Sequence, residues 1–255
     1  MDLHPFRRNT NPGAGGEQKT LKSENEVPVS EVFLSVQGEG VHAGTPSIFL
    51  RTYYCNLTCT WCDTKFTWLD QGASKPGINY DLMTHDELMK KVMEYHPCRH
   101  LVLTGGEPLM HQRVLAPLLS SLKQAGFFIE VETNGTIAPT PETMENVDCF
   151  NVSPKIANSL VDERLRIRPD SLALFARSQK AWFKFVICSD EDLTQVEDLI
   201  SRFAIPRDQV LLMPEGIDAP TLLERSKWLV AICIQKNLRF SPRLHILLFG
   251  NKKGT

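Results

Sequence analysis

Short apolar runs alternate with amphipathic segments along most of the chain. Runs of strand length occur at residues 32–34, 47–51, 100–103, 127–131, 150–152, 182–187, 210–212 and 238–240. Apolar residues recur at helical spacing in 84–95, 113–125, 189–203 and 220–236. Strands that alternate with helices predict right-handed βαβ units and a parallel sheet.

The number of strands predicts an open barrel. The first two runs flank a short polar loop and predict a two-stranded ribbon. About six strands follow the ribbon, whereas a closed (β/α)₈ barrel has eight. We therefore expect an α/β fold with a partial, open TIM-type barrel of about six parallel strands.

Domain boundaries follow from the same pattern. Residues 1–26 are polar, rich in Gly, Asn and Pro, and without apolar periodicity, so we expect a disordered N-terminal extension. An organellar transit peptide is the alternative, although Glu17 and Glu24 dilute its basic character. Residues 27–255 suit a single large α/β domain.

Composition excludes several classes of protein. The net charge of −2 carries no electrostatic footprint for nucleic acid. No apolar run reaches the length of a membrane span, and no secretory signal is evident. The chain has 7 cysteines, an odd number that includes a cluster of three. We therefore expect a reduced, cytoplasmic metal protein rather than a disulfide scaffold.

A polar motif follows each of five predicted strands. The motifs are CNLTCTWC at 55–62, TGGEP at 104–108, ETNGT at 132–136, SPK at 153–155 and MPEG at 213–216. In barrels of parallel strands, the carboxyl ends of the strands line the active site. Five motifs that are distant in sequence are therefore expected on one face.

Cys55, Cys59 and Cys62 form a CxxxCxxC motif, and such spacing allows three thiolates to bind one metal centre. The next cysteine is Cys98. An electron-transfer cluster normally takes four thiolates, so three would leave one iron free for another ligand. The alternative is a zinc knuckle with His42 as fourth ligand, but zinc sites usually come as paired Cys or Cys-His units.

Three other polar positions each allow a functional and a purely structural interpretation. The glycines of QGEG at 37–40 permit close approach of a ligand, or form an ordinary turn. The donor fork of Arg51 suits a carboxylate, or a surface ion pair. The hydroxyl of Thr64 can bind Mg²⁺, or belong to an ordinary loop.

The cysteine motif, with Trp61 directly before the third cysteine, resembles the radical S-adenosylmethionine (SAM) superfamily. The resemblance implies one [4Fe–4S] cluster whose free iron binds the methionine part of SAM. Reductive cleavage of SAM then yields a 5′-deoxyadenosyl radical. GGE at 105–107 resembles the motif of that superfamily that binds the SAM amino group.

The motifs together resemble a narrower family, the 7-carboxy-7-deazaguanine synthases. The resemblance runs from about residue 27 to the C-terminus and rests on SVQGEG, CDTKFTW, TGGEP, ETNGT, VSPK and SPRLH. It implies ring contraction of 6-carboxy-5,6,7,8-tetrahydropterin to 7-carboxy-7-deazaguanine, with loss of ammonia, for queuosine and other 7-deazapurines. In that reaction the radical takes a hydrogen from C6 of the pterin and SAM is regenerated, while Mg²⁺ contacts the substrate carboxylate.

The resemblance also implies roles for individual residues. The expected cluster ligands are Cys55, Cys59 and Cys62, and the expected Mg²⁺ ligand is Thr64. The expected SAM-binding residues are Trp61, Asp63, Gly106, Glu107, Asn134, Ser153, Pro154, Lys155 and Lys184. The expected substrate-binding residues are Val36, Gln37, Gly38, Arg51 and Thr104. No acid–base residue is assigned.

The chain departs from the family where Ile246 follows His245, since the family often has Lys there, and this leaves the role of His245 open. One alternative is a radical SAM activase that makes a glycyl radical on a partner protein. An alternative of another class is a zinc-binding interaction protein. For the synthase we expect a pterin substrate, a flavodoxin or ferredoxin reductant, a homodimer, and neither nucleic acid nor membrane as a partner.

Overall fold

The computed structural model describes residues 25–69 and 80–255. Residues 1–24 of the expected extension lie outside this range, and Glu26 already belongs to the first strand. The described residues form a nine-stranded sheet with the order β3-β1-β2-β4-β5-β6-β7-β8-β9. The strands are β1 (Glu26–Val36), β2 (Pro46–Thr52), β3 (Asp81–Thr84), β4 (His100–Gly105), β5 (Phe128–Thr133), β6 (Cys149–Val152), β7 (Ala181–Ile187), β8 (Val210–Pro214) and β9 (Arg239–Phe240).

The direction of the strands agrees with the sequence pattern. β1 pairs antiparallel with β2 and β3, and every pair from β2 to β9 is parallel. Six strands, β4 to β9, follow the first ribbon, as the pattern predicts. β3 and β9 stand at opposite edges of the order, so the sheet is not closed. The prediction of a partial, open barrel is confirmed.

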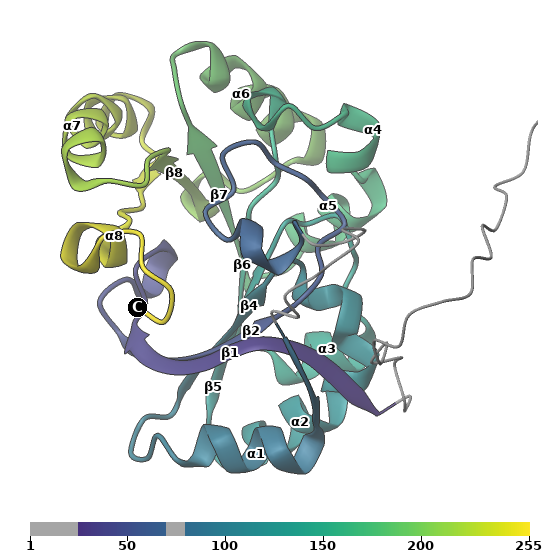
Figure 1. The fold of residues 1–255 in the computed structure, drawn as a ribbon. Coiled ribbons are helices and arrows are strands. Elements are labelled where there is room, and N and C mark those ends of the chain that lie inside the picture. The colour runs from purple at the N-terminus through teal and green to yellow at the C-terminus, as the bar shows by residue number, and fades with distance from the viewer. Residues whose placement is uncertain (1–24, 70–79) are drawn as a thin grey trace, which may run out of the picture.

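Helices cover the outer face of this curved sheet (Figure 1). They are α1 (His85–Met93), α2 (Gln112–Gln124), α3 (Pro141–Asn146), α4 (Glu163–Arg166), α5 (Pro169–Ala176), α6 (Glu191–Phe203), α7 (Ala219–Lys236) and α8 (Leu244–Phe249). Short 3₁₀ turns include η1 (Gly40–His42) and η2 (Lys65–Thr67). α1 and α2 lie beside the first half of the sheet, and α6 and α7 beside the second. Every residue of β6 and β8 is buried, as expected for strands covered on both faces.

Local sequence features fix several element ends. The Thr84 hydroxyl accepts from the Glu87 backbone N–H, and the Glu87 carboxylate accepts from the Thr84 N–H, which completes a capping box at the start of α1. Leu88 and Val92 face the core from that helix. Gly126 follows α2 with φ +79°, a conformation that glycine adopts without strain. No helix of the described residues is long and apolar enough to cross a membrane.

Several short elements are absent from the sequence prediction: β3, α3, α4, α5 and α8. β3 has four residues, of which only Met83 is buried, and its pairing with residues 26–29 is distant in sequence. α8 has six residues and no side-chain cap at its start. The backbone N–H of Leu244 donates to Gly38 O at 2.8 Å, so a long-range contact holds this helix against the 37–39 segment. The C-terminus lies beside this junction (Figure 1).

Candidate active site

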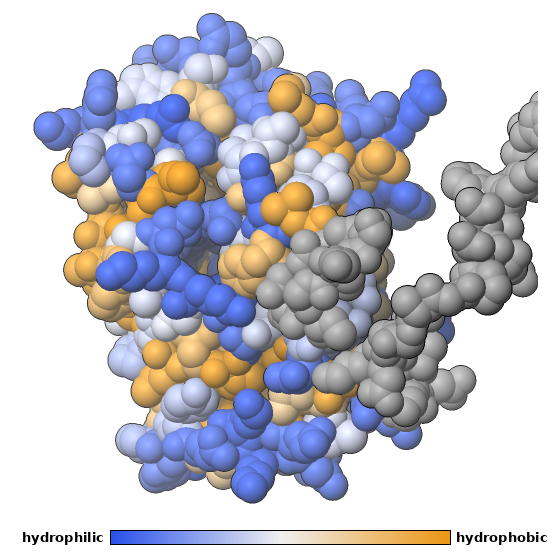
Figure 2. Space-filling view, in the orientation of Figure 1, coloured by the Kyte–Doolittle hydropathy of each residue, from blue (hydrophilic) through white to orange (hydrophobic). Residues whose placement is uncertain are grey.

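A cavity of about 470 Å³ lies at the carboxyl ends of the parallel strands. The face that it opens on is hollowed and largely hydrophilic around the hollow (Figure 2). Sixteen of the residues expected from sequence line it: Val36, Gln37, Gly38, Arg51, Cys55, Cys59, Trp61, Cys62, Asp63, Thr64, Thr104, Gly106, Asn134, Ser153, Lys155 and Lys184. Glu107 and Pro154 are not among the lining residues. The five motifs that follow strands therefore meet at one cavity, and its size is typical of small-molecule sites.

The three clustered cysteines follow β2 and face the cavity. Among the described residues, the three cysteine sulfurs do not all lie within 4.8 Å of one another. Tetrahedral zinc holds its sulfur ligands about 3.8 Å apart, given Zn–S bonds of about 2.3 Å. The three thiols are therefore not all close enough for one tetrahedral zinc, and they face the cavity. His42 does not line the cavity, so a zinc knuckle with His42 as fourth ligand is wrong.

Neighbouring groups surround the cysteine sulfurs. Trp68 Nε1 donates to Cys62 Sγ at 3.3 Å, and the Leu57 backbone N–H donates to Cys55 Sγ at 3.5 Å. Thr64 Oγ1 lies 3.6 Å from Cys62 Sγ. Burial raises the pKa of Cys55 to about 12, so the free thiol is neutral and iron must drive its ionisation. Hydrogen bonds to sulfur are one of the means by which a protein sets the potential of an iron–sulfur centre.

The segment after β6 meets the cysteine loop. Lys155 Nζ lies 5.2 Å from the centre of the Trp61 ring and donates to Ser153 Oγ at 2.9 Å. Trp61 Nε1 donates to Asn158 O at 3.1 Å. These contacts fix an aromatic ring and a cation on the cysteine side of the cavity.

The GGE motif forms the floor between β4 and β5. A Cβ atom at Gly106 would lie 2.1 Å from Tyr54 O, so only glycine fits against the start of the cysteine loop. Glu107 is fully buried, and its carboxylate accepts from Thr133 Oγ1 at 2.8 Å and from the Asn134 N–H at 2.7 Å. Burial raises the pKa of Glu107, and these hydrogen bonds oppose the rise. In this structure Glu107 holds the strand ends together; its expected contact with SAM stays a prediction.

A chain of charges crosses the opposite wall. Lys184 Nζ lies 2.6 Å from Glu39 Oε2 and 2.8 Å from Glu132 Oε2. Arg243 Nε lies 3.0 Å from Glu39 Oε1, and another Arg243 nitrogen donates to Asp63. Burial raises the pKa of Glu39, but the charges of Lys184 and Arg243 outweigh it and hold that pKa well below its usual range. Burial raises the pKa of Glu132, with Lys184 opposing.

The QGEG loop joins this wall to the C-terminal helix. Gln37 Nε2 donates to Glu132 Oε1 at 3.2 Å. Gly38 lies against His245, where a Cβ atom would come within 2.0 Å of Nδ1. His245 Nε2 is 4.0 Å from Glu39 Oε1, and burial lowers the pKa of His245, so its imidazole is neutral near pH 7.

Arg51 forms an ion pair and also lines the cavity, while its expected role in binding the substrate carboxylate stays a prediction. Its Nε donates to Glu31 Oε1 at 2.6 Å, which is the ion pair that sequence left as the alternative. The same residue lines the cavity. The ion pair fixes the guanidinium plane, so the terminal nitrogens can bind an anion in the cavity.

Sequence reasoning missed several residues of the cavity wall: Glu39, Glu132, Glu215, Arg243, Asn251, Lys252, Lys253 and Thr255. Glu39 and Glu132 lie inside motifs that were recognised, QGEG and ETNGT, and period-2 alternation along β5 places Glu132 on the face of Glu130. Arg243 belongs to SPRLH. The C-terminal residues have no sequence signal, because they reach the site only through the position of α8.

Comparisons with known proteins agree with this geometry. The Radical SAM superfamily model matches residues 49–188. The 7-carboxy-7-deazaguanine synthase of Pyrobaculum aerophilum is 36% identical over 235 residues, which cover 92% of this chain and 100% of the relative. The enzyme of that name from Hyperthermus butylicus is 34% identical and covers 91% of this chain and 96% of the relative.

Among solved structures, the crystal structure of QueE from Escherichia coli aligns with a TM-score of 0.65 at 27% identity. It covers 86% of this chain and 98% of the QueE chain. The resemblance inferred from the motifs is confirmed, and with it the [4Fe–4S], SAM and Mg²⁺ dependence typical of these enzymes. The chain belongs to the radical SAM superfamily and, within it, to the 7-carboxy-7-deazaguanine synthase family.

Proposed function

We propose that this chain is a lyase that converts 6-carboxy-5,6,7,8-tetrahydropterin to 7-carboxy-7-deazaguanine with release of ammonia. The product would enter 7-deazapurine synthesis, including queuosine. Full-length similarity to 7-carboxy-7-deazaguanine synthases supports the activity. The observation that carries the proposal is that one cavity joins three cluster-type cysteines to a wall of buried charges.

The cysteine side of the cavity is assigned to the cofactors. Cys55, Cys59 and Cys62 would hold the [4Fe–4S] cluster. When bound, the cluster and SAM supply the reductive radical chemistry that starts the reaction. The cation of Lys155 and the hydroxyl of Ser153 suit the carboxylate of SAM, since both can donate hydrogen bonds to it.

The remaining residues expected to bind SAM have distinct positions. Gly106 leaves room at the strand end, and Trp61 offers a flat ring to an adenosyl group. Asn134 Nδ2 donates to Asn56 Oδ1 at 2.9 Å, which fixes its amide beside the cysteine loop. Lys184 stands instead among the carboxylates of the opposite wall.

The opposite wall suits a pterin. The carboxylates of Glu39 and Glu132 can accept hydrogen bonds from the amino and ring N–H groups of the substrate. Gln37 and the neutral imidazole of His245 add donors and acceptors on the same side. These fixed groups would hold C6 of the pterin at one position, which is the main contribution that a protein makes when cofactors carry the chemistry.

The substrate carboxylate is assigned to Arg51 and Thr64. The terminal nitrogens of Arg51 would bind it directly, because Nε is held by Glu31. Thr64 Oγ1 offers an oxygen ligand to Mg²⁺, which prefers oxygen and keeps positions for substrate and water. Bound Mg²⁺ would supply charge neutralisation at that carboxylate. Thr104 and Val36 also line the cavity.

We further propose a small electron-transfer protein, a flavodoxin or ferredoxin, as the reductant, and a homodimer as the assembly. We place the enzyme in the cytoplasm, where thiols remain reduced. All seven cysteines are free thiols, which supports this location.

The proposal is tested with protein purified without oxygen and reconstituted with iron and sulfide. SAM, a reductant and 6-carboxytetrahydropterin are added, and ammonia and the absorbance of 7-carboxy-7-deazaguanine are followed. We expect product with SAM unspent. A Cys59→Ala variant is the control and should form neither cluster nor product.

Two outcomes would contradict the proposal. Cleavage of SAM without any product from the pterin would return the chain to the glycyl-radical activases. A colourless protein that binds zinc at the three cysteines would exclude radical chemistry.

A further inference from the structure

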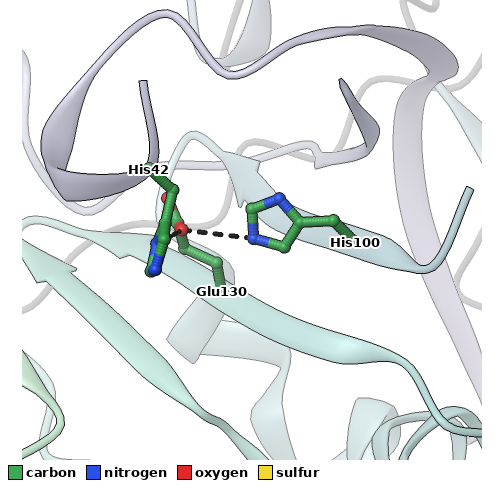
Figure 3. Close-up of side chains that lie close together, drawn as sticks. All are labelled: His42, His100 and Glu130. Atoms are coloured by element: carbon green, nitrogen blue, oxygen red, sulfur yellow. Dashed lines mark hydrogen bonds and ion pairs between the residues drawn. The ribbon is translucent and has the colours of Figure 1, made fainter. Parts of the chain in front are cut away.

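A second group of polar side chains lies outside the cavity. It consists of His42 from η1, His100 from β4 and Glu130 from β5, and their ligand atoms lie within 4.8 Å of one another (Figure 3). None of the three lines the cavity. The Glu130 side chain is fully buried, and that of His42 is 32% exposed. The group is therefore reached by solvent from the His42 side.

The two oxygens of Glu130 have different partners. Oε1 accepts from the side-chain amides of Asn151, at 2.5 Å, and of Gln37. Oε2 is hydrogen-bonded to His42 Nδ1 at 2.5 Å and lies 3.3 Å from His100 Nε2, so a cation bound here would displace the proton between Oε2 and His42. This arrangement is typical of a carboxylate that binds a metal: amides hold one oxygen, and the other oxygen is the ligand.

The hydrogen bonds of Ser47 determine the tautomer of His100. Ser47 Oγ donates its only proton to Thr45 O at 2.9 Å. Ser47 Oγ also lies 2.8 Å from His100 Nδ1, so Nδ1 must carry the proton that this contact needs. With the proton on Nδ1, the lone pair of Nε2 points toward Glu130 Oε2.

That lone pair has no hydrogen-bond partner. His100 is 7% exposed, and its Nε2 is among the buried polar atoms without a hydrogen bond. The 3.3 Å approach to Glu130 Oε2 lacks the geometry of a hydrogen bond, so two acceptors face each other. A cation bound by both atoms would remove this repulsion and satisfy the buried nitrogen.

We propose that His42 Nδ1, His100 Nε2 and Glu130 Oε2 bind one divalent cation of the zinc class. Two imidazoles and one carboxylate are a ligand set that Zn²⁺ prefers, with water as the fourth ligand. A histidine that binds a metal through one ring nitrogen usually makes a hydrogen bond with the other, as His100 Nδ1 does with Ser47 Oγ.

The site would fix the loop between β1 and β2. η1 follows residues 37–39 of the cavity wall directly, and a cation on His42 would join it to β4 and β5. The role that we assign is structural, since Gln37 separates the site from the cavity. The proposal does not depend on turnover of any substrate.

The test uses full-length protein with its iron–sulfur cluster already loaded, so that the cluster cysteines do not bind zinc. Zn²⁺ is titrated alone in competition with a chromophoric chelator, and zinc per chain is measured after desalting. We expect one equivalent, and a higher melting temperature with zinc. His42→Phe and Glu130→Gln should each weaken binding by at least about 100-fold.

Two matched variants control the result. His42→Cys keeps a zinc ligand and should keep one equivalent. His85→Asn removes a histidine outside this group and should bind like the wild type. A wild-type protein that binds no zinc, or a His42→Phe protein that binds it as tightly, would overturn the proposal and leave a protonated His–carboxylate pair. Circular dichroism and iron content establish that each variant folds.

Discussion

Lys184 Nζ lies 2.8 Å from Glu132 Oε2, and only 2% of the Lys184 side chain is exposed. The same ammonium group is 2.6 Å from Glu39 Oε2. One buried cation therefore balances two carboxylates, one from the loop after β1 and one from β5. Burial opposes the charge on Lys184, but the two carboxylates outweigh burial and raise its pKa above the usual value.

Lys184→Met should destabilise the protein by about 3–5 kcal/mol, because Glu132 loses the cation that it pairs with and Glu39 keeps only Arg243. Urea denaturation of the wild type and the variant measures the difference in unfolding free energy. Lys123→Met is the control, since Lys123 pairs with Asp148 while its side chain is 40% exposed, and such pairs contribute about 0–1 kcal/mol. Equal effects of the two substitutions would contradict this prediction.

Trp68→Phe should lower the reduction potential of the cluster. The indole N–H donates to Cys62 Sγ at 3.3 Å, and a hydrogen bond to sulfur stabilises the reduced, more negative cluster. A hydrogen bond contributes about 0.5–1.5 kcal/mol, which corresponds to roughly 20–60 mV for one electron. A redox titration followed by electron paramagnetic resonance measures the shift. Trp228→Phe, where the indole donates to Asp190, should leave the potential unchanged.

Thr64→Ala should lower turnover of the pterin by roughly 10–100-fold, since Mg²⁺ loses a protein ligand. Thr64→Ser keeps the oxygen and should keep most of the activity. The two rates are compared at saturating Mg²⁺, together with the rate of SAM cleavage. An enzyme that activates a glycyl radical would be little affected, so full ring-contraction activity in Thr64→Ala would show that the Mg²⁺ assignment is wrong.

Short-range patterns predicted much of this molecule. The alternation of apolar runs predicted the parallel sheet, and the helical spacing over residues 84–95 predicted α1. The position of the cysteine motif after a strand correctly predicted that the three thiols lie at the cavity. Each of these features depends on residues that are close together in sequence.

The missing part of the prediction depends on long-range contacts. Lys184 and Glu39 are separated by 145 positions, and His42 and Glu130 by 88. From the sequence alone, a charged residue or a histidine at one of these positions does not reveal its partner, because only the fold brings the two side chains together. The C-terminal residues reach the cavity for the same reason, through the backbone contact of Leu244 with Gly38.

Gly38→Ala should disturb the substrate side of the cavity and leave the cluster intact. The new Cβ would lie 2.0 Å from His245 Nδ1 and 2.9 Å from His245 N, so both the ring and the backbone of α8 must move. A displacement of about 1 Å at a binding site can reduce activity by about 100-fold. We expect a higher KM for the pterin with unchanged iron content.

Gly44→Ala is the matched control for Gly38→Ala. It lies in the same loop with φ +94°, and its Cβ would meet nothing within 4 Å. It therefore measures backbone strain without a contact. If Gly44→Ala raised KM as much as Gly38→Ala, the contact with His245 would not be the cause.

The low pKa of Glu39 should make stability depend on pH. Burial favours the neutral acid, but Lys184, Arg243 and His245 hold the pKa of the folded state below the ordinary value of 4.5. The unfolded chain thus binds a proton near pH 4.5 that the folded chain does not bind. This stability is fully present above that pH and is lost as pH falls toward the folded pKa, at up to about 1.4 kcal/mol per pH unit.

Glu39→Gln should remove this part of the pH dependence. Unfolding free energies of the wild type and the variant, measured by urea from about pH 6 to about pH 3.5, should converge as pH falls, because the ionised carboxylate stabilises only the wild type. Glu145→Gln, at an exposed position, controls for the loss of one carboxylate. Parallel curves for the wild type and Glu39→Gln would mean that Glu39 takes up its proton equally in the folded and unfolded chains, and that the charges around it do not hold it ionised.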